Sequence, residues 1–123
     1  MAKKALDLLK EYDGVYLHIK GADEFGHDGE PLKKKESIEK IDKDFFGNIM
    51  DIDLYETALV ISADHSTPCQ LKTHSDDPVP LVICSEKIIK DKICRFTERE
   101  VKKGSLGLMY GKDVLKKVLD ILS

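Results

Sequence analysis

Three of the four histidines, His27, His65 and His74, occur in a pattern with two aspartates: Asp23-x-x-x-His27, then Asp64-His65, then His74. Imidazole nitrogen and carboxylate oxygen are the ligand types that suit zinc, manganese and other first-row divalent ions in hydrolytic or phosphoryl-transfer centres. A single histidine is more often a surface or hydrogen-bonded residue than a ligand. Five such residues, each at a strand end or in a connecting loop, favour a metal site.

Three apolar runs are placed so that they could position these residues. The alternating run Val15–Ile19 predicts a strand, and the glycine-rich stretch Gly21–Gly29 predicts a loop that carries Asp23 and His27. The run Thr57–Ala63 is nearly all apolar, as in a strand covered on both faces, and it leads directly to Asp64 and His65. A further run, Val79–Cys84, follows His74. We therefore expect ligands outside the carboxyl ends of parallel strands.

The remaining segments alternate between helical and extended patterns. Helical apolar spacing opens the chain around Ala5–Leu9, and a second helix is predicted from Pro31 to about Asn48, with a solvated run Lys33–Lys35. Further predictions are a helical segment over Ser85–Lys92, a short edge strand over Arg95–Val101 and an amphipathic helix over Lys112–Leu122. With the apolar runs, this order predicts an α/β fold, a three-layer sandwich with a mostly parallel sheet, formed by one domain over residues 1–123.

Three segments carry a resemblance to a known family: His18–Gly29, Ala63–Pro68 and Lys72–Pro80. In this order they resemble the C-terminal third of the archaeal-type cofactor-independent (2,3-bisphosphoglycerate-independent) phosphoglycerate mutases, which belong to the alkaline phosphatase superfamily. The resemblance extends over almost the whole chain. It implies an alkaline phosphatase-like fold, of which this chain would be the C-terminal portion.

The resemblance also implies a two-metal centre and no organic cofactor. Positions matching Asp23, His27 and His74 would bind one divalent ion, and those matching Asp64 and His65 the other; manganese, zinc, magnesium and cobalt are the candidate metals. Such enzymes interconvert 3-phosphoglycerate and 2-phosphoglycerate in glycolysis and gluconeogenesis through a phosphoserine intermediate. No residue here matches the nucleophilic serine, so we expect a fragment that is inactive alone.

Some neighbouring residues have two interpretations. Lys20 is a candidate contact for a substrate phosphate, with a solvated lysine as the alternative. His18 is expected to pack or hydrogen-bond and not to ligate a metal. Ser66 and Ser75 are interpreted as hydrogen-bonding loop residues, because no general base accompanies them in the sequence, and Ser62 lies inside the apolar run, a poor place for an exposed nucleophile.

Composition narrows the classes of partner and location. The 123 residues have a net charge of −3, so there is no basic surface that would predict nucleic-acid binding. No apolar stretch is long enough to span a membrane, and the three cysteines show no C-x-x-C spacing, which favours free thiols and a cytoplasmic location. An open sheet edge would make self-association plausible.

Two alternatives to the mutase remain open at this point. One is another phosphotransferase or hydrolase of the alkaline phosphatase superfamily, because the metal motifs are shared within it. The other is a non-catalytic metal-binding module. A site rich in carboxylates argues against a purely structural zinc, which prefers closed thiolate or imidazole sites.

Overall fold

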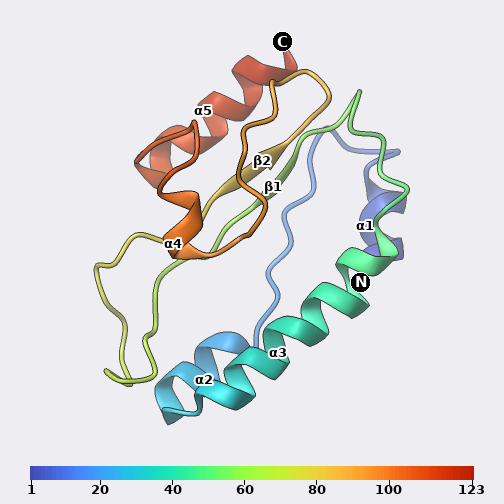
Figure 1. Cartoon of the computed structure of the whole chain (residues 1–123). Helices are drawn as coiled ribbons and strands as arrows, with labels where there is room; N and C mark the ends of the chain where they lie inside the picture. Colours follow the sequence, from blue (N-terminus) through green and yellow to red (C-terminus); the bar gives the residue numbers. More distant parts are fainter. The chain divides into compact units, whose positions relative to one another are not determined.

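The computed structural model describes every residue from Met1 to Ser123 and divides the chain into two compact units. Unit 1 comprises Met1–Ile52 and Thr67–Ser75, and unit 2 comprises Asp53–Ser66 and Asp76–Ser123. Along the chain the elements are helices α1 (Ala2–Leu8), α2 (Ala22–Asp28) and α3 (Pro31–Asp44), the 3-10 helix η1 (Phe46–Asn48), strands β1 (Leu59–Ile61) and β2 (Val82–Cys84), and helices α4 (Glu98–Val101) and α5 (Gly111–Leu122) (Figure 1).

Unit 1 is helical, and its longest helix is α3. Pro31 occupies the first turn, where its fixed φ and missing N–H are tolerated, and α3 ends at Asp44 before η1 continues the chain to Asn48. The predicted helix from Pro31 to about Asn48 is thus confirmed, with a change from α to 3-10 geometry in its last turn. The buried apolar residues of this unit are Ala2, Ala5, Phe45 and Ile49.

Helix α2 lies against α3, and it replaces the loop predicted for residues 21–29 (Figure 1). That prediction was wrong because the glycines delimit the helix and do not break it. Gly29 is left-handed (φ 71°, ψ 34°), and the N–H groups of Gly29 and Glu30 donate to the carbonyls of Gly26 and Phe25 at 3.1 and 2.9 Å. This pair of hydrogen bonds is the Schellman motif, which ends a helix at a glycine.

The prediction of a strand over Val15–Ile19 was also wrong for this structure, because the segment has no regular secondary structure. A strand exists only with a hydrogen-bonded neighbour, and no strand of the chain pairs with these residues. Tyr16 is 87% exposed and Leu17 37% exposed, so the alternating apolar side chains remain largely uncovered.

Unit 2 contains a single pair of strands, and the pair is antiparallel. Leu59 lies opposite Cys84 and Ile61 opposite Val82. Both strands fall inside the apolar runs that predicted them, but the expected mostly parallel sheet is not found in this chain. An apolar run in the sequence predicts a buried, extended segment. It does not predict whether two such strands are parallel or antiparallel, because that depends on how the chain connects them.

The C-terminal half of unit 2 differs from the prediction in two places. Residues 85–92 form turns and no helix: the N–H of Lys87 donates to the Ser85 hydroxyl, and that of Ile88 to its carbonyl. The expected strand over Arg95–Val101 is helix α4, whose N-cap Thr97 accepts from the N–H of Glu100 at 3.3 Å. The spacing Thr97-x-x-Glu100 is a capping-box signature, which indicates the start of a helix and not a strand.

Helix α5 confirms the predicted amphipathic helix over Lys112–Leu122, with its first residue at Gly111. No helix of the chain is both long enough and apolar enough to cross a membrane. The three cysteines are free thiols.

Gly26 is predicted to be essential for the stability of unit 1. A Cβ at this position would lie 2.5 Å from the Thr67 carbonyl oxygen, a backbone atom that cannot move aside easily. We expect Gly26→Ala to lower the free energy of unfolding by about 1–3 kcal/mol, as for overpacked sites. Gly47→Ala, where a Cβ would meet nothing within 4 Å, is the matched control. Equal urea midpoints for the two variants would contradict this.

Asp91 is predicted to make unit 2 less stable in acid. The Ser105 N–H at 3.0 Å and the Ile93 N–H at 2.9 Å donate to its carboxylate and lower its pKa. Because the folded state then binds this proton less readily than the unfolded state, the stabilisation is present above the unfolded pKa of about 3.9 and is lost as pH falls through the folded value.

The test of this prediction is thermal unfolding at pH 7 and pH 3 for the native chain and for Asp91→Asn. The variant should lose less stability between the two pH values than the native chain. Asp120→Asn on α5 removes the same charge and serves as the control, and the same pH dependence in all three proteins would contradict the prediction.

Candidate metal centre

Helix α2 places Asp23 and His27 on one face, because residues four apart lie one above the other along a helix. Asp23 is in the first turn and His27 in the last turn. The Nε2 atom of His27 lies 3.5 Å from Oδ1 of Asp23. The Asp-x-x-x-His spacing therefore brings together two candidate ligands, through a helix and not through the predicted loop.

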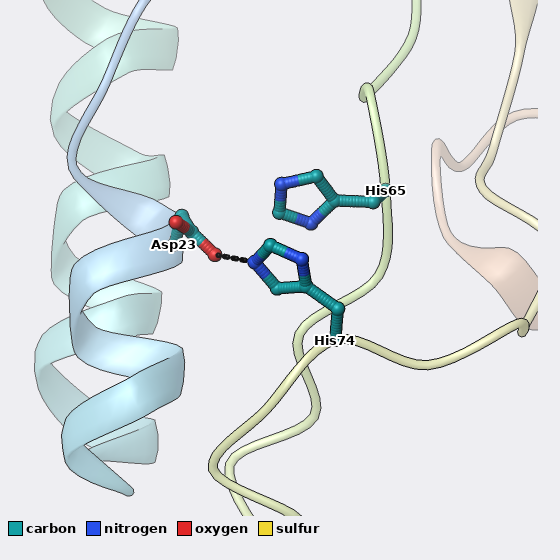
Figure 2. Close-up of side chains that lie close together, drawn as sticks. All are labelled: Asp23, His65 and His74. Carbon is teal, nitrogen blue, oxygen red and sulfur yellow. Dashed lines mark ion pairs between the residues drawn. The ribbon is translucent and has the colours of Figure 1, made fainter.

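The third candidate ligand, His74, comes from the segment Thr67–Ser75 of the same unit. Its Nε2 lies 3.6 Å from Oδ1 of Asp23, and Figure 2 draws this ion pair between α2 and the incoming chain. The same nitrogen lies 3.2 Å from Nε2 of His27, although the two histidines are 47 residues apart in sequence. The structure thus brings Asp23, His27 and His74 together.

The three donor atoms form a triangle with edges of 3.2, 3.5 and 3.6 Å. A small divalent ion with bonds of about 2.1 Å separates its ligands by about 3.0 Å in octahedral and about 3.4 Å in tetrahedral geometry. Moreover, two imidazole nitrogens that face each other at 3.2 Å need a proton or a cation between their lone pairs. The spacing and the chemistry of the donors both fit a divalent ion.

The three side chains are about half exposed, so the site is open to solvent. The relative exposure is 46% for Asp23, 42% for His27 and 52% for His74. Structural zinc sites are closed by four protein ligands, whereas catalytic sites keep a position for water or substrate. An ion held by these three residues would have positions free for exchangeable ligands.

The imidazole of His27 is oriented by the backbone. Its Nδ1 lies 3.1 Å from the carbonyl oxygen of Lys72. A carbonyl oxygen only accepts, so Nδ1 carries the proton and Nε2 presents its lone pair toward Asp23 and His74. Lys72 has φ 54°, the only positive value at a non-glycine residue of the chain. The strained turn at Lys72 supplies the carbonyl that selects the ligand tautomer.

Asp23 is held in turn by Thr67, a residue that sequence reasoning did not single out. The Thr67 hydroxyl donates to Oδ1 of Asp23 at 2.6 Å, and the residue is only 4% exposed. The ammonium group of Lys34 donates to the Thr67 carbonyl at 2.7 Å. The run Lys33–Lys35, predicted as a solvated face, is exposed at Lys33 and Lys35 and half-buried at Lys34. Thr67 lies two residues after His65 of the Asp64-His65 motif, and this proximity is the signal that the sequence offered.

Asp64 and His65 belong to unit 2, shortly after β1. The N–H of His65 donates to Oδ1 of Asp64 at 3.1 Å, and its Nε2 lies 3.5 Å from Oδ2. Asp64 is 58% exposed and His65, also drawn in Figure 2, is 30% exposed. The two side chains thus face each other as an adjacent carboxylate and imidazole.

The other residues considered from the sequence have ordinary surroundings. Lys20 is exposed and contributes to an open groove of about 680 Å³ in unit 1, together with Phe25 and Ile41. The Ser62 hydroxyl donates to the Pro80 carbonyl at 3.0 Å. The Cys69 thiol lies 3.8 Å from the Phe25 carbonyl, to which it donates.

Comparison with known proteins finds matches over nearly the whole chain. The model of a protein family described as the Metalloenzyme superfamily matches residues 1–120. The chain is 48% identical to the 2,3-bisphosphoglycerate-independent phosphoglycerate mutase of Pyrococcus abyssi, over 99% of this chain and 30% of that protein. It is 45% identical to the 2,3-bisphosphoglycerate-independent phosphoglycerate mutase 1 of Archaeoglobus fulgidus, over 98% of this chain and 29% of that protein.

A solved structure is also similar to this chain over nearly its whole length. The PH0037 protein from Pyrococcus horikoshii matches with a TM-score of 0.94 and 47% identity, over 98% of this chain and 37% of that one. The chain therefore spans about 30% of the length of the curated relatives it matches.

The hydrogen bond to Lys72 predicts the tautomer of His27. We expect neutral His27 to carry its proton on Nδ1, because only this form donates to the carbonyl at 3.1 Å. Long-range ¹H–¹⁵N correlation spectra of the imidazole nitrogens in metal-free protein distinguish the two tautomers. A dominant Nε2–H form for His27 would contradict the arrangement.

Proposed function

Because the chain belongs to the Metalloenzyme superfamily, we propose that it is the metal-binding C-terminal part of a 2,3-bisphosphoglycerate-independent phosphoglycerate mutase. The whole enzyme would interconvert 3-phosphoglycerate and 2-phosphoglycerate through a phosphoserine intermediate. The observation that carries this proposal is the triangle of Asp23, His27 and His74 donors, whose edges of 3.2–3.6 Å suit a small divalent ion. The names of the similar proteins supply the reaction.

Two divalent ions are proposed for the whole enzyme. Asp23, His27 and His74 would hold one, and Asp64 with His65 would contribute to the other. Mixed imidazole and carboxylate ligands are compatible with manganese, zinc, magnesium or cobalt. When bound, such ions supply Lewis-acid polarisation and neutralise charge on the phosphate being transferred.

The roles of this chain's own residues follow from their chemistry. Asp23 contributes negative charge to the site, and the Lys72 carbonyl keeps the Nε2 atom of His27 available as a donor. Lys20, an exposed residue three positions before Asp23, is a proposed contact for a substrate phosphate. The nucleophilic serine would come from outside the 123 residues.

Exposed apolar side chains support the assignment to a longer protein. Tyr16, Met50, Ile89, Leu108 and Leu115 are each more than two thirds exposed. Burial of a large apolar side chain is favourable by about 1.5–3 kcal/mol, so these side chains are candidates for contacts with the rest of a longer protein. We propose that residues 1–123 form part of one domain of the enzyme, a three-layer alkaline phosphatase-like sandwich whose parallel strands lie outside this chain. A glycolytic role would place the enzyme in the cytoplasm.

The proposal is tested with a full-length protein containing this chain, assayed for conversion of 3-phosphoglycerate in the presence of Mn²⁺. We expect Asp23→Asn, His27→Ala and His74→Ala each to lower Mn²⁺ affinity and to reduce activity at least about 100-fold, because each removes a ligand. Asp28→Asn, which changes the same charge at the other end of α2, is the control for Asp23.

Unchanged activity and Mn²⁺ affinity in the three ligand variants would refute the metal assignment. Normal Mn²⁺ binding with no conversion of 3-phosphoglycerate by the full-length protein, but with turnover of another phosphate ester, would refute the mutase assignment alone. The two parts of the proposal are therefore tested separately.

A further inference from the structure

We propose that Thr67 is the positioning residue of Asp23 and that Lys34 holds Thr67 in place for this role. The inference rests on the proposed function, since it concerns the same metal-binding carboxylate. It adds two residues, one on the segment Thr67–Ser75 and one on α3, that would not touch the ion themselves. Their effect would be to fix the direction of one carboxylate oxygen before an ion binds.

The Thr67 hydroxyl and the two imidazoles approach the same oxygen of Asp23. Thr67 donates to Oδ1 of Asp23 at 2.6 Å, and the same Oδ1 lies 3.5 and 3.6 Å from the Nε2 atoms of His27 and His74. A carboxylate oxygen has lone pairs for more than one partner. The Thr67 hydroxyl and the two imidazoles are thus all neighbours of Oδ1, and the hydroxyl leaves lone-pair capacity on this atom for an ion. This arrangement fixes the rotation of the carboxylate and favours binding of an ion through one oxygen.

Contacts on its backbone hold Thr67 in place. It is buried, and its backbone contacts α2 at Gly26, where a side chain would collide with the Thr67 carbonyl. The Lys34 ammonium donates to that same carbonyl at 2.7 Å in a partly buried position. The neighbouring Lys33 instead makes a loose, exposed ion pair with Glu30 at 3.4 Å. Only the central lysine of the run is directed at the chain that carries the hydroxyl.

The hydroxyl and the methyl group of Thr67 have different contacts. A Cβ built on Gly26 would lie 2.9 Å from the Thr67 methyl carbon, so the hydrocarbon part of Thr67 packs against α2. The hydroxyl has a different partner, the proposed ligand. The methyl group of Thr67 packs against α2, and its hydroxyl positions Asp23. Substitutions that keep one of these groups and remove the other can therefore distinguish the two roles.

The experiment measures Mn²⁺ binding to the full-length protein that contains this chain by calorimetry, with unfolding of the metal-free protein as an independent readout. We expect Thr67→Val, which keeps the shape and removes the hydroxyl, to weaken Mn²⁺ binding 10- to 100-fold, as for removal of partners that orient metal ligands. Thr67→Ser keeps the hydroxyl and should bind within about threefold of the native chain.

Lys34→Met and Lys33→Met form a matched pair, because both remove one positive charge from the same turn of α3. We expect Lys34→Met to weaken Mn²⁺ binding about three- to tenfold and Lys33→Met to leave it unchanged, since only Lys34 reaches Thr67. A general loss of charge would affect both variants equally, and that result would overturn the role of Lys34.

The role of Thr67 is overturned if Thr67→Val folds and binds Mn²⁺ as tightly as the native chain, or if Thr67→Ser loses as much affinity as Thr67→Val. If Thr67→Val does not fold, Thr67→Ala against Thr67→Ser gives the same comparison. Failure of the proposed function looks different: Asp23→Asn would then bind Mn²⁺ like Asp28→Asn. Loss of binding in Asp23→Asn with native binding in Thr67→Val refutes this inference alone.

Discussion

The close approach of Thr67 to helix α2 is the contact on which the candidate site depends. Asp23 and Thr67 are 44 residues apart, and closing a loop of that length costs about 3 kcal/mol in chain entropy. The side chains of Asp23, His27 and His74 are roughly half exposed, and even if the imidazoles were protonated their contacts with Asp23 would contribute only about 0–1 kcal/mol each. They cannot hold the segment in place on their own.

The contacts that can offset this entropy lie beneath the site. The Thr67 hydroxyl to the Asp23 carboxylate and the Lys34 ammonium to the Thr67 carbonyl are hydrogen bonds to charged groups, each typically about 1.5–3 kcal/mol. Because these bonds make the approach favourable, His74 reaches His27 without having to contribute to stability itself. The two histidine donors of the triangle are therefore not required for this stability.

Much of the candidate site could be predicted from residue types and spacing, whereas much of the sheet could not. Asp23 and His27 can lie close together in a helix as well as in a loop. The predicted grouping of these residues with His74 was therefore unaffected by the wrong prediction of a loop. Strand direction and pairing depend on tertiary contacts. For that reason the run Val15–Ile19 predicted a strand that has no partner here, and β1 pairs with β2 in the antiparallel direction.

The residues that sequence reasoning missed share a physical reason. Thr67, Gly26 and Lys34 have no distinctive chemistry as residue types, and their importance comes from a close backbone approach between distant segments. A lysine run looks solvated unless the carbonyl that one member reaches is known. Local periodicity predicted α3 and α5 well because a helix is specified by neighbours within a few residues.

The segment Thr67–Ser75 contributes to the site at both ends of α2. Near the start of the helix the Thr67 hydroxyl fixes Asp23, and near its end the Lys72 carbonyl fixes His27. The backbone approach is close at Gly26, where a Cβ would collide with the Thr67 carbonyl, whereas a Cβ at Gly29 would meet the flexible end of the Lys72 side chain. The positive φ of Lys72 costs about 1–3 kcal/mol, and the contacts along this segment must offset that strain. A segment that served only as a connection would not need a close backbone approach at Gly26 and a strained residue at Lys72, so its geometry is better explained by the alignment of Asp23 and His27.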